Sequence, residues 1–187
     1  MNNAQNVSAA KPPIGGAIYA APVGTTLPTD TDTALDPAFK DLGFVSSDGI
    51  TNGTNIDSSD VKAWGGDTVL TTINSKDDTF KFNLIETLRE DVLKFVYGAA
   101  NVSGSLLTGL HIGVSSQDVP EVSLVIDMLL RGNVKKRFCV AAAKISNVED
   151  IVYNDNNAIG YNTTLKCSPG SDGYTHHEYI KAANISG

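Results

Sequence analysis

The sequence predicts a mainly β fold: an antiparallel β-sandwich or barrel with one packed amphipathic α-helix. Three observations point to it: apolar and polar residues alternate with a period of two in several segments, short turns join these segments, and helical periodicity occurs once. Of the 187 residues, 41% are hydrophobic and 7% aromatic, which is enough for a modest aliphatic core.

The two ends of the chain predict tails around a single domain. Residues 1–13 are polar and end in two prolines, so we expect a flexible N-terminal arm. Residues 14–183 have the length of one domain. The last residues, 184–187, form a C-terminal tail without a clear structural signal.

The first part of the domain predicts two short strands and a long loop. We expect strands over 15–22 and 39–46, with a Thr- and Asp-rich loop between them. Asp48-Gly49 and Asn52-Gly53 are typical of turns, so a long loop is expected around 46–62.

A β-hairpin with a polar, acidic second face is expected next. Phe80, Phe82 and Leu84 alternate with polar residues, as in a strand with one face in water. Val69 alternates more weakly in the preceding strand, and the sequence predicts the turn at 74–78.

One segment has the pattern of an amphipathic helix, expected over 88–97. Thr87 and Glu90 form a capping-box pattern at its start, and Gly98 is a suitable end. Its apolar stripe consists of Leu88, Val92, Phe95 and Val96. Further strands are expected over 121–131, 134–146, 158–167 and 174–181, with turns at 131–133 and 168–173.

The formal charge of −7 is distributed unevenly. Residues 1–80 carry 10 acidic and 4 basic side chains, whereas residues 81–187 carry 11 and 10. Such a chain is repelled by nucleic-acid phosphates and anionic membranes. With no secretory signal, no apolar stretch long enough to span a bilayer and only two cysteines, we expect a soluble protein in a reducing cytoplasm.

The sequence offers no catalytic, metal or cofactor site. It lacks the common nucleotide-binding, hydrolase and zinc-protease motifs. On a strand, His176 and Glu178 share a face while His177 points away, which leaves too few ligands for a metal. Cys139 and Cys167 are expected in the core. The chain therefore reads as a binding or structural protein rather than an enzyme.

Two long segments resemble the major tail tube protein of long-tailed, non-contractile bacteriophages. They are "GGAIYAAPVGTTLPTDTDTALDPAFKDLGFVSSDGI" (15–50) and "AWGGDTVLTTINSKDDTFKFNLIETLREDVLKFVYG" (63–98), in this order and with the helix after the second. Together they cover a little over a third of the chain.

The resemblance implies a subunit of hexameric rings that stack into a hollow tube. Strands of all six copies would complete an inter-subunit β-barrel, through which the phage DNA passes without being bound. The implied partners are further copies of the chain, the tape-measure protein, and tail terminator and tip proteins. The implied location is the virion tail, assembled in the host cytoplasm. Residues 1–13 and the loop at 46–62 match the segments that contact the adjacent ring.

The acidic residues of the hairpin and the basic run supply candidates for the channel and for these contacts. A channel that must not hold DNA is expected to be acidic, and the channel-facing candidates are Asp60, Asp67, Asp77 and Asp78. The alternative is that these carboxylates form ion pairs between rings with the basic run. Trp64 is either a core anchor or an exposed contact. The inter-subunit or inter-ring candidates are Ile14, Ile50, Ile56, Trp64, Lys135, Lys136 and Arg137.

Two rival interpretations remain open at this point. The first is a surface β-sandwich such as an adhesin or glycan-binding module, which the Thr- and Asn-rich strands suit but the missing secretory signal does not. The second is the tube of a contractile or tail-like injection particle, which shares the fold class.

Overall fold

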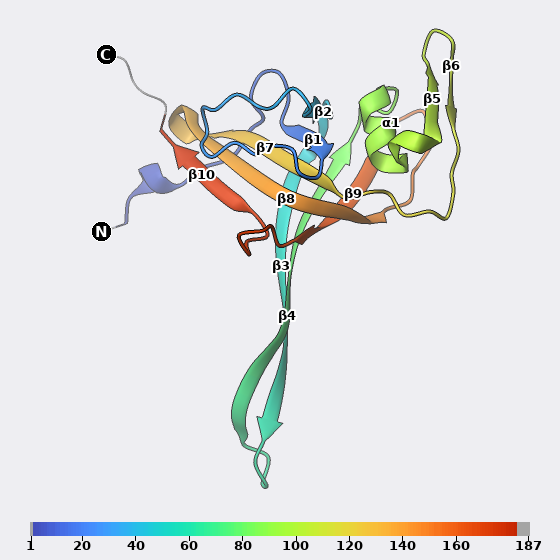
Figure 1. Ribbon diagram of the computed structural model, residues 1–187. Helices are drawn as coiled ribbons and strands as arrows, with labels where there is room; N and C mark the ends of the chain where they lie inside the picture. The colour runs from blue at the N-terminus through green and yellow to red at the C-terminus, as the bar shows by residue number, and fades with distance from the viewer. Residues whose placement is uncertain (1, 183–187) are drawn as a thin grey trace.

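The computed structural model describes residues 2–182, most of which lie in antiparallel strands (Figure 1). Within these residues, the main sheet runs β2-β1-β7-β8-β9-β4-β3, with β10 also paired to β8, and β5–β6 form a separate hairpin. The strands are β1 (Ile18–Pro22), β2 (Lys40–Asp41), β3 (Val45–Lys62), β4 (Thr68–Leu84), β5 (Val102–Ser105), β6 (Gly109–Ile112), β7 (Val122–Leu130), β8 (Val134–Val148), β9 (Tyr161–Ser168) and β10 (His177–Lys181). The helices are α1 (Glu90–Tyr97) and the 3-10 turns η1 (Ala4–Asn6), η2 (Ala99–Asn101) and η3 (Arg131–Asn133).

Strand β8 organises the main sheet. One of its edges pairs with β7, and the other pairs first with β10 and then, beyond residue 141, with β9. The sheet twists and folds over, so that residues of β1, β7 and β8 meet those of β4 and β9 in one core. This sandwich-like antiparallel architecture confirms the predicted fold class, and the sheet of the single subunit is not closed into a barrel.

Helix α1 covers one side of the core. Val92 and Phe95 are buried, and the Phe95 ring stacks on Phe82 with 6.3 Å between ring centroids. Gly98, at φ +90°, ends the helix as expected. A helix of eight residues is marginal by itself, so its packing on the sheet stabilises it. No helix within residues 2–182 is both long and apolar enough to cross a membrane.

The start of α1 differs from the prediction. Its N-cap is Arg89 with an extended backbone and no side-chain cap, so the capping box expected at Thr87 is wrong. Residues 86–89 form a turn instead, in which the Arg89 amide donates to the Glu86 carbonyl at 3.1 Å. Leu88 lies in this turn and is 68% exposed, so it does not belong to the apolar stripe.

The other face of β7 and β8 is covered by the loop between β1 and β2. Leu27 and Leu35 of this loop pack on Val125 and Cys139, and the Cys139 thiol contacts the Pro28 carbonyl at 3.4 Å. Cys139 and Cys167 are both free and buried, which confirms the core position expected for them. Burial raises the pKa of each of the two thiols to about 12.

The side chain of Arg137 holds this loop in place, and its position corrects one of the predictions. Its guanidinium donates two hydrogen bonds to the Asp127 carboxylate, at 2.6 and 2.8 Å, and two more to the carbonyls of Asp30 and Thr33. With 7% exposure and all these bonds inside one subunit, Arg137 is not the intersubunit contact that was expected. A buried charge needs such partners, because an unpaired one is strongly destabilising.

The N-terminal segment lies beside the end of β7. Lys11 and Leu129 exchange backbone hydrogen bonds at 2.9 and 2.8 Å, and Ser8 Oγ accepts from the Arg131 amide at 2.7 Å. The flexibility predicted for residues 1–13 stays a prediction. The C-terminal tail predicted at 184–187 lies outside the described residues.

Candidate assembly surface

Beyond residue 53, strands β3 and β4 leave the body and continue as a long two-stranded arm (Figure 1). We call residues 54–78 the arm. Strand β4 pairs with β9 only over 79–84, so each strand of the arm has only the other as its partner. At about 3.3 Å per residue, residues 54–62 span roughly 30 Å. The arm is therefore about as long as a small domain is wide.

The arm replaces two features that the sequence predicted, the loop at 46–62 and the turn at 74–78. Both segments are strand, so both predictions are wrong. The turn-forming residues are absorbed in the ladder instead. Gly49, at φ +72°, lies in a register irregularity between Val45 and Ile50, and Gly53 leaves room for the Thr79 hydroxyl opposite. Long-range pairing thus overrides the local turn preference.

The actual turn lies at the tip of the arm, over residues 63–67. Gly65 and Gly66 have φ values of +121° and +101°, which other residues rarely adopt. Ala63 and Asp67 close the turn, with 2.8 Å between the Ala63 amide and the Asp67 carbonyl. Trp64 projects from it and is fully exposed, which decides against the core anchor.

Apart from Asp78 at its root, neither face of the arm is buried within the subunit. Cross-strand pairing places Ile56 and Asp60 on one face and Val61 on the other, opposite Leu70. Polar contacts hold the ladder together, such as the hydrogen bond from Thr71 to Asp60 at 2.7 Å. The exposed large apolar residues of the arm are Ile56, Val61, Trp64, Val69, Leu70 and Ile73.

Both outer edges of the arm lack a strand partner among the described residues. An isolated two-stranded hairpin is only marginally stable in water. Free edges also present rows of unpaired N–H and C=O groups that pair readily with another strand. The geometry is that of a surface completed by other chains.

The root of the arm is fixed by a buried carboxylate, Asp78. It accepts hydrogen bonds from Asn52 of β3 and from Thr175, each at 2.8 Å, and from the ring of His176. The His176 ring in turn packs edge-on against Phe80. Asp78 is 3% exposed, so it does not face a channel, which corrects the prediction for this residue.

We expect Asp78 to make the fold sensitive to acid. Burial alone would raise the pKa of Asp78, but hydrogen bonds from His176, Thr175 and Asn52 outweigh it, so the pKa lies below the ordinary 3.8. A carboxyl with a lowered folded-state pKa stabilises the protein fully above its unfolded pKa. That stabilisation is lost as the pH falls through the folded pKa.

The measurement is the free energy of unfolding of the native subunit and of Asp78→Asn, from pH 2 to 7. At neutral pH the variant should be less stable by about 1.5–3 kcal/mol, the range for hydrogen bonds to a charged group. Below pH 3.8 the difference should shrink. Other carboxyls with lowered pKa values, Asp32 among them, are present in both proteins, so their effects cancel in the difference between the two pH profiles. Parallel pH profiles would contradict this role of Asp78.

Comparison with known families decides what kind of protein carries this arm. The family model described as phage tail tube protein matches residues 1–184, nearly the whole chain. The chain belongs to the phage tail tube protein family. None of the curated proteins matches it. The tail tube subunit is thus a structural component of the virion tail that forms a homo-oligomeric tube with other tail proteins, which confirms the resemblance and sets aside the adhesin.

The other three acidic candidates of this tail tube subunit lie on the arm. Asp60 and Asp67 are exposed, and Asp77 is partly exposed and paired with Lys166 of β9 at 2.8 Å. Asp60 and Asp77 are on opposite faces of the ribbon, since Asp77 pairs with Asn55, five positions before Asp60. If the arm lines a channel, only one of these two faces can do so.

The basic and apolar interface candidates also differ in how far they are exposed and paired. Lys135 pairs with Asp32 at 2.7 Å, and Lys136 pairs with Glu178 at 2.8 Å on the other face of the strand. Ile50 is half-buried and packs against the core. Ile14, Ile56 and Trp64 are exposed and available for contacts.

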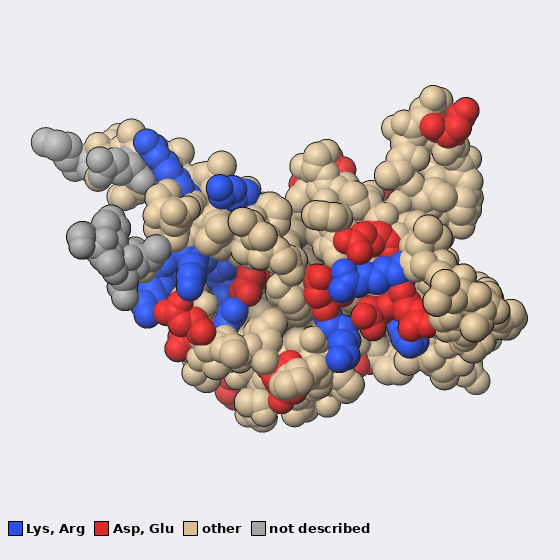
Figure 2. All heavy atoms as spheres, turned by 90° about the horizontal axis from the view of Figure 1, so that it is seen from above, with Lys and Arg blue, Asp and Glu red and all other residues tan. Residues whose placement is uncertain are grey.

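The face opposite the arm carries mixed charge rather than a field of one sign (Figure 2). Red and blue side chains lie next to one another there. Ion pairs of the tail tube subunit include Arg89 with Asp41 and Lys181 with Asp32, at 3.1 and 2.6 Å. An exposed pair such as Lys181 with Asp32 contributes little stability.

No group of three or more possible metal ligands occurs among residues 2–182. His176 and Glu178 share a face as predicted, with 3.5 Å between Nε2 and Oε1, but His176 is held by Asp78. His177 points away and contacts Asp172 at 2.7 Å. Family membership indicates a structural role for the subunit.

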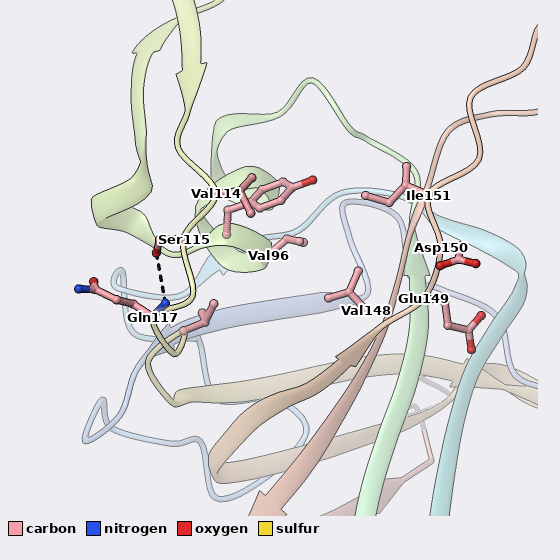
Figure 3. Close-up of a pocket in the computed structure, with 10 residues that line it drawn as sticks. Val96, Val114, Ser115, Gln117, Val148, Glu149, Asp150 and Ile151 are labelled. Carbon is pink, nitrogen blue, oxygen red and sulfur yellow. Dashed lines mark hydrogen bonds between the residues drawn. The ribbon is translucent and has the colours of Figure 1, made fainter.

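Two features were missed from the sequence. One is the β5–β6 hairpin, whose tip exposes Leu106 and Leu107. The other is a pocket of about 430 Å³ beside the end of α1 (Figure 3), between the segment after β6 and the segment after β8. The alternation over Val102–Ile112 could have indicated the hairpin, whereas the pocket joins segments far apart in the sequence.

Proposed function

We propose that this tail tube subunit forms hexameric rings that stack into a hollow tube, through which double-stranded DNA leaves the virion. The observation that carries the proposal is the arm with its two unpaired edges. If the arms of neighbouring copies lie side by side, β3 of one can pair with β4 of the next. A row of this kind leaves a free edge at each end until it closes into a cylinder, which removes all edges.

The number six comes from the resemblance to the tail tube proteins of long-tailed phages. Purified subunits at rising concentration should assemble into rings and tubes, which negative-stain electron microscopy and class averaging of end views would reveal. Six-fold end views are expected. A protein that stays monomeric, or rings of another symmetry, would refute the corresponding part of the proposal.

We further propose that one acidic face of the arm lines the channel and keeps DNA mobile. Each Lys or Arg that contacts a phosphate adds affinity through counterion release, so a conduit should present few free cations. On the body, the lysines that point outward from β4, β8 and β9 agree with this, whereas Lys62 and Lys76 of the arm have no carboxylate partner among the described residues. Lys81, Lys144 and Lys166 are each ion-paired, to Glu149, Asp118 and Asp77.

Charge reversal on the arm tests the channel. Because Asp60 and Asp77 lie on opposite faces, Asp60→Lys and Asp77→Lys should differ, and only the channel-facing variant should retain DNA. In six-fold rings it should bind linear duplex with an affinity that falls about 10³-fold or more between 50 and 200 mM salt, as for six to ten phosphate contacts. Phage carrying that variant should have normal tails and reduced infectivity.

The matched control is Asp155→Lys, an exposed carboxylate on the loop after β8. If both arm variants deliver DNA as the control does, the carboxylates of the arm do not line the channel. The remaining partners, namely the tape-measure, terminator and tip proteins, and assembly in the bacterial cytoplasm, follow from the resemblance and belong to the same proposal.

A further inference from the structure

The pocket beside α1 is lined by apolar and polar side chains, and two of its lining residues are acidic. Val96 and Val114 line it from one side and Val148 and Ile151 from the other, with Asp150 at the rim (Figure 3). Its volume of about 430 Å³ lies within the range of sites that take a compact apolar group. The Asp150 carboxylate is exposed and has no hydrogen-bond or ion-pair partner among residues 2–182.

The tip of the arm has the complementary chemistry. Trp64 is fully exposed, and Lys62, two residues before it, has no carboxylate partner within the described chain. The tip points away from the body, while α1 and the pocket lie at the opposite end of the molecule (Figure 1). When copies follow one another along an axis, the tip of one is therefore directed at the pocket-bearing end of the next.

We propose that Trp64 of one subunit inserts into the pocket beside α1 of a subunit in the next ring, with Lys62 paired to Asp150 at its rim. This inference rests on the proposed function, because it requires stacked rings. A projecting apolar group that fits a pocket elsewhere on the same molecule makes a head-to-tail contact that does not close, and such contacts build filaments.

The competing place for the tip is the apolar end of the β5–β6 hairpin. Leu106 and Leu107 are both exposed there. The pocket instead has a hollow lined in part by valine and isoleucine side chains that can contact an indole ring, and its polar lining groups can accept a hydrogen bond from the indole N–H. Buried tryptophans of this kind are frequent hot spots of interfaces.

Trp64 is the only tryptophan of the chain, so its fluorescence reports this contact without labelling. In the free subunit its emission should be that of an indole in water, fully open to acrylamide quenching. On assembly, the emission should shift to the blue and the quenching constant should fall several-fold. Tubes in which Trp64 remains accessible to the quencher would overturn this inference but would not contradict the proposed assembly into a tube.

Two pairs of variants locate the site. Val114→Glu places a charge in the pocket at an exposed position, and Leu107→Glu is the matched change on the hairpin tip. The first should raise the critical concentration for assembly by about tenfold or more, the second by about twofold or less. The opposite order would overturn the inference in favour of the hairpin tip.

The rim contact is tested by charge exchange. Lys62→Glu and Asp150→Lys should each raise the critical concentration, and the double variant should restore it toward the native value. Additive losses would overturn the pairing of Lys62 with Asp150. If the native subunit forms no tubes at any concentration, the proposed function itself fails, which is a different result from tubes with an exposed Trp64.

Discussion

A subunit in which residues 55–77 are replaced by an Asn-Gly turn should fold like the native subunit and form no tubes. Asn-Gly favours the tight turn that can join Thr54 to Asp78, which are paired neighbours in the native ladder. The pairing of β4 with β9 over 79–84 and the contacts of Asp78 remain. The variant lacks the free edges on which the proposed cylinder depends, together with the tip that carries Lys62 and Trp64.

The expected loss of assembly is large, because many backbone hydrogen bonds at about 0.5–1.5 kcal/mol each are removed per interface. We expect no tubes by electron microscopy or sedimentation at a hundred times the native critical concentration, on the scale of 1.4 kcal/mol per tenfold. Thermal unfolding followed by circular dichroism would show that the body is intact. Tubes of native diameter from the shortened subunit would contradict the role of the arm.

A second variant separates the edges of the arm from its side chains. Ile56→Thr with Ile73→Thr keeps both strands and removes apolar surface from one face. Threonine retains a high strand propensity, so the ladder should persist. This variant should still form tubes, although at a higher concentration. If it behaved like the shortened subunit, side-chain packing rather than backbone pairing would drive closure.

Phe80→Ala should give the largest loss of folding stability of any single change considered. Phe80 is fully buried, and its ring centroid lies 5.2 Å from that of Phe138 and 5.5 Å from that of His176. Replacing a buried phenylalanine by alanine costs about 3–5 kcal/mol. For a domain of this size, that corresponds to a fall of roughly 6–20 °C in the melting temperature.

The control for this prediction is Phe44→Ala, because Phe44 is 72% exposed in the subunit. Its free energy of unfolding should change by about 0.5 kcal/mol or less. Denaturant titration of both variants below the concentration for assembly is the measurement. Equal losses in the two variants would show that Phe80 does not hold the root of the arm to the core.

The sequence predicted the body of this fold well and the arm poorly. Period-two alternation located Phe80, Phe82 and Leu84 in the core because one side of that strand is buried. In the arm both faces are exposed, so alternation carries no information. Turn-forming pairs such as Asn52-Gly53 then dominated the prediction, although the ladder accommodates them.

Charged residues were the hardest part of the site to place. Asp78 and Arg137 were read as surface groups because charged side chains are rarely buried, and their partners are distant in sequence. Asp78 meets Thr175 and His176 nearly a hundred residues away, and Arg137 meets the carbonyl of Asp30. Only the folded topology brings these groups together. Trp64, in contrast, lies beside two glycines, and the sequence alone indicated it as a contact candidate.

The burial of both thiols matters for anyone who wants to use the particle as a material. With a pKa of about 12 for each thiol, Cys139 and Cys167 are almost entirely protonated at neutral pH. They should therefore not react with maleimides. One cysteine engineered at an exposed position would then be the sole reactive handle of every subunit. The assembled tube would carry one conjugation site per protomer, and the native cysteines would not have to be replaced first.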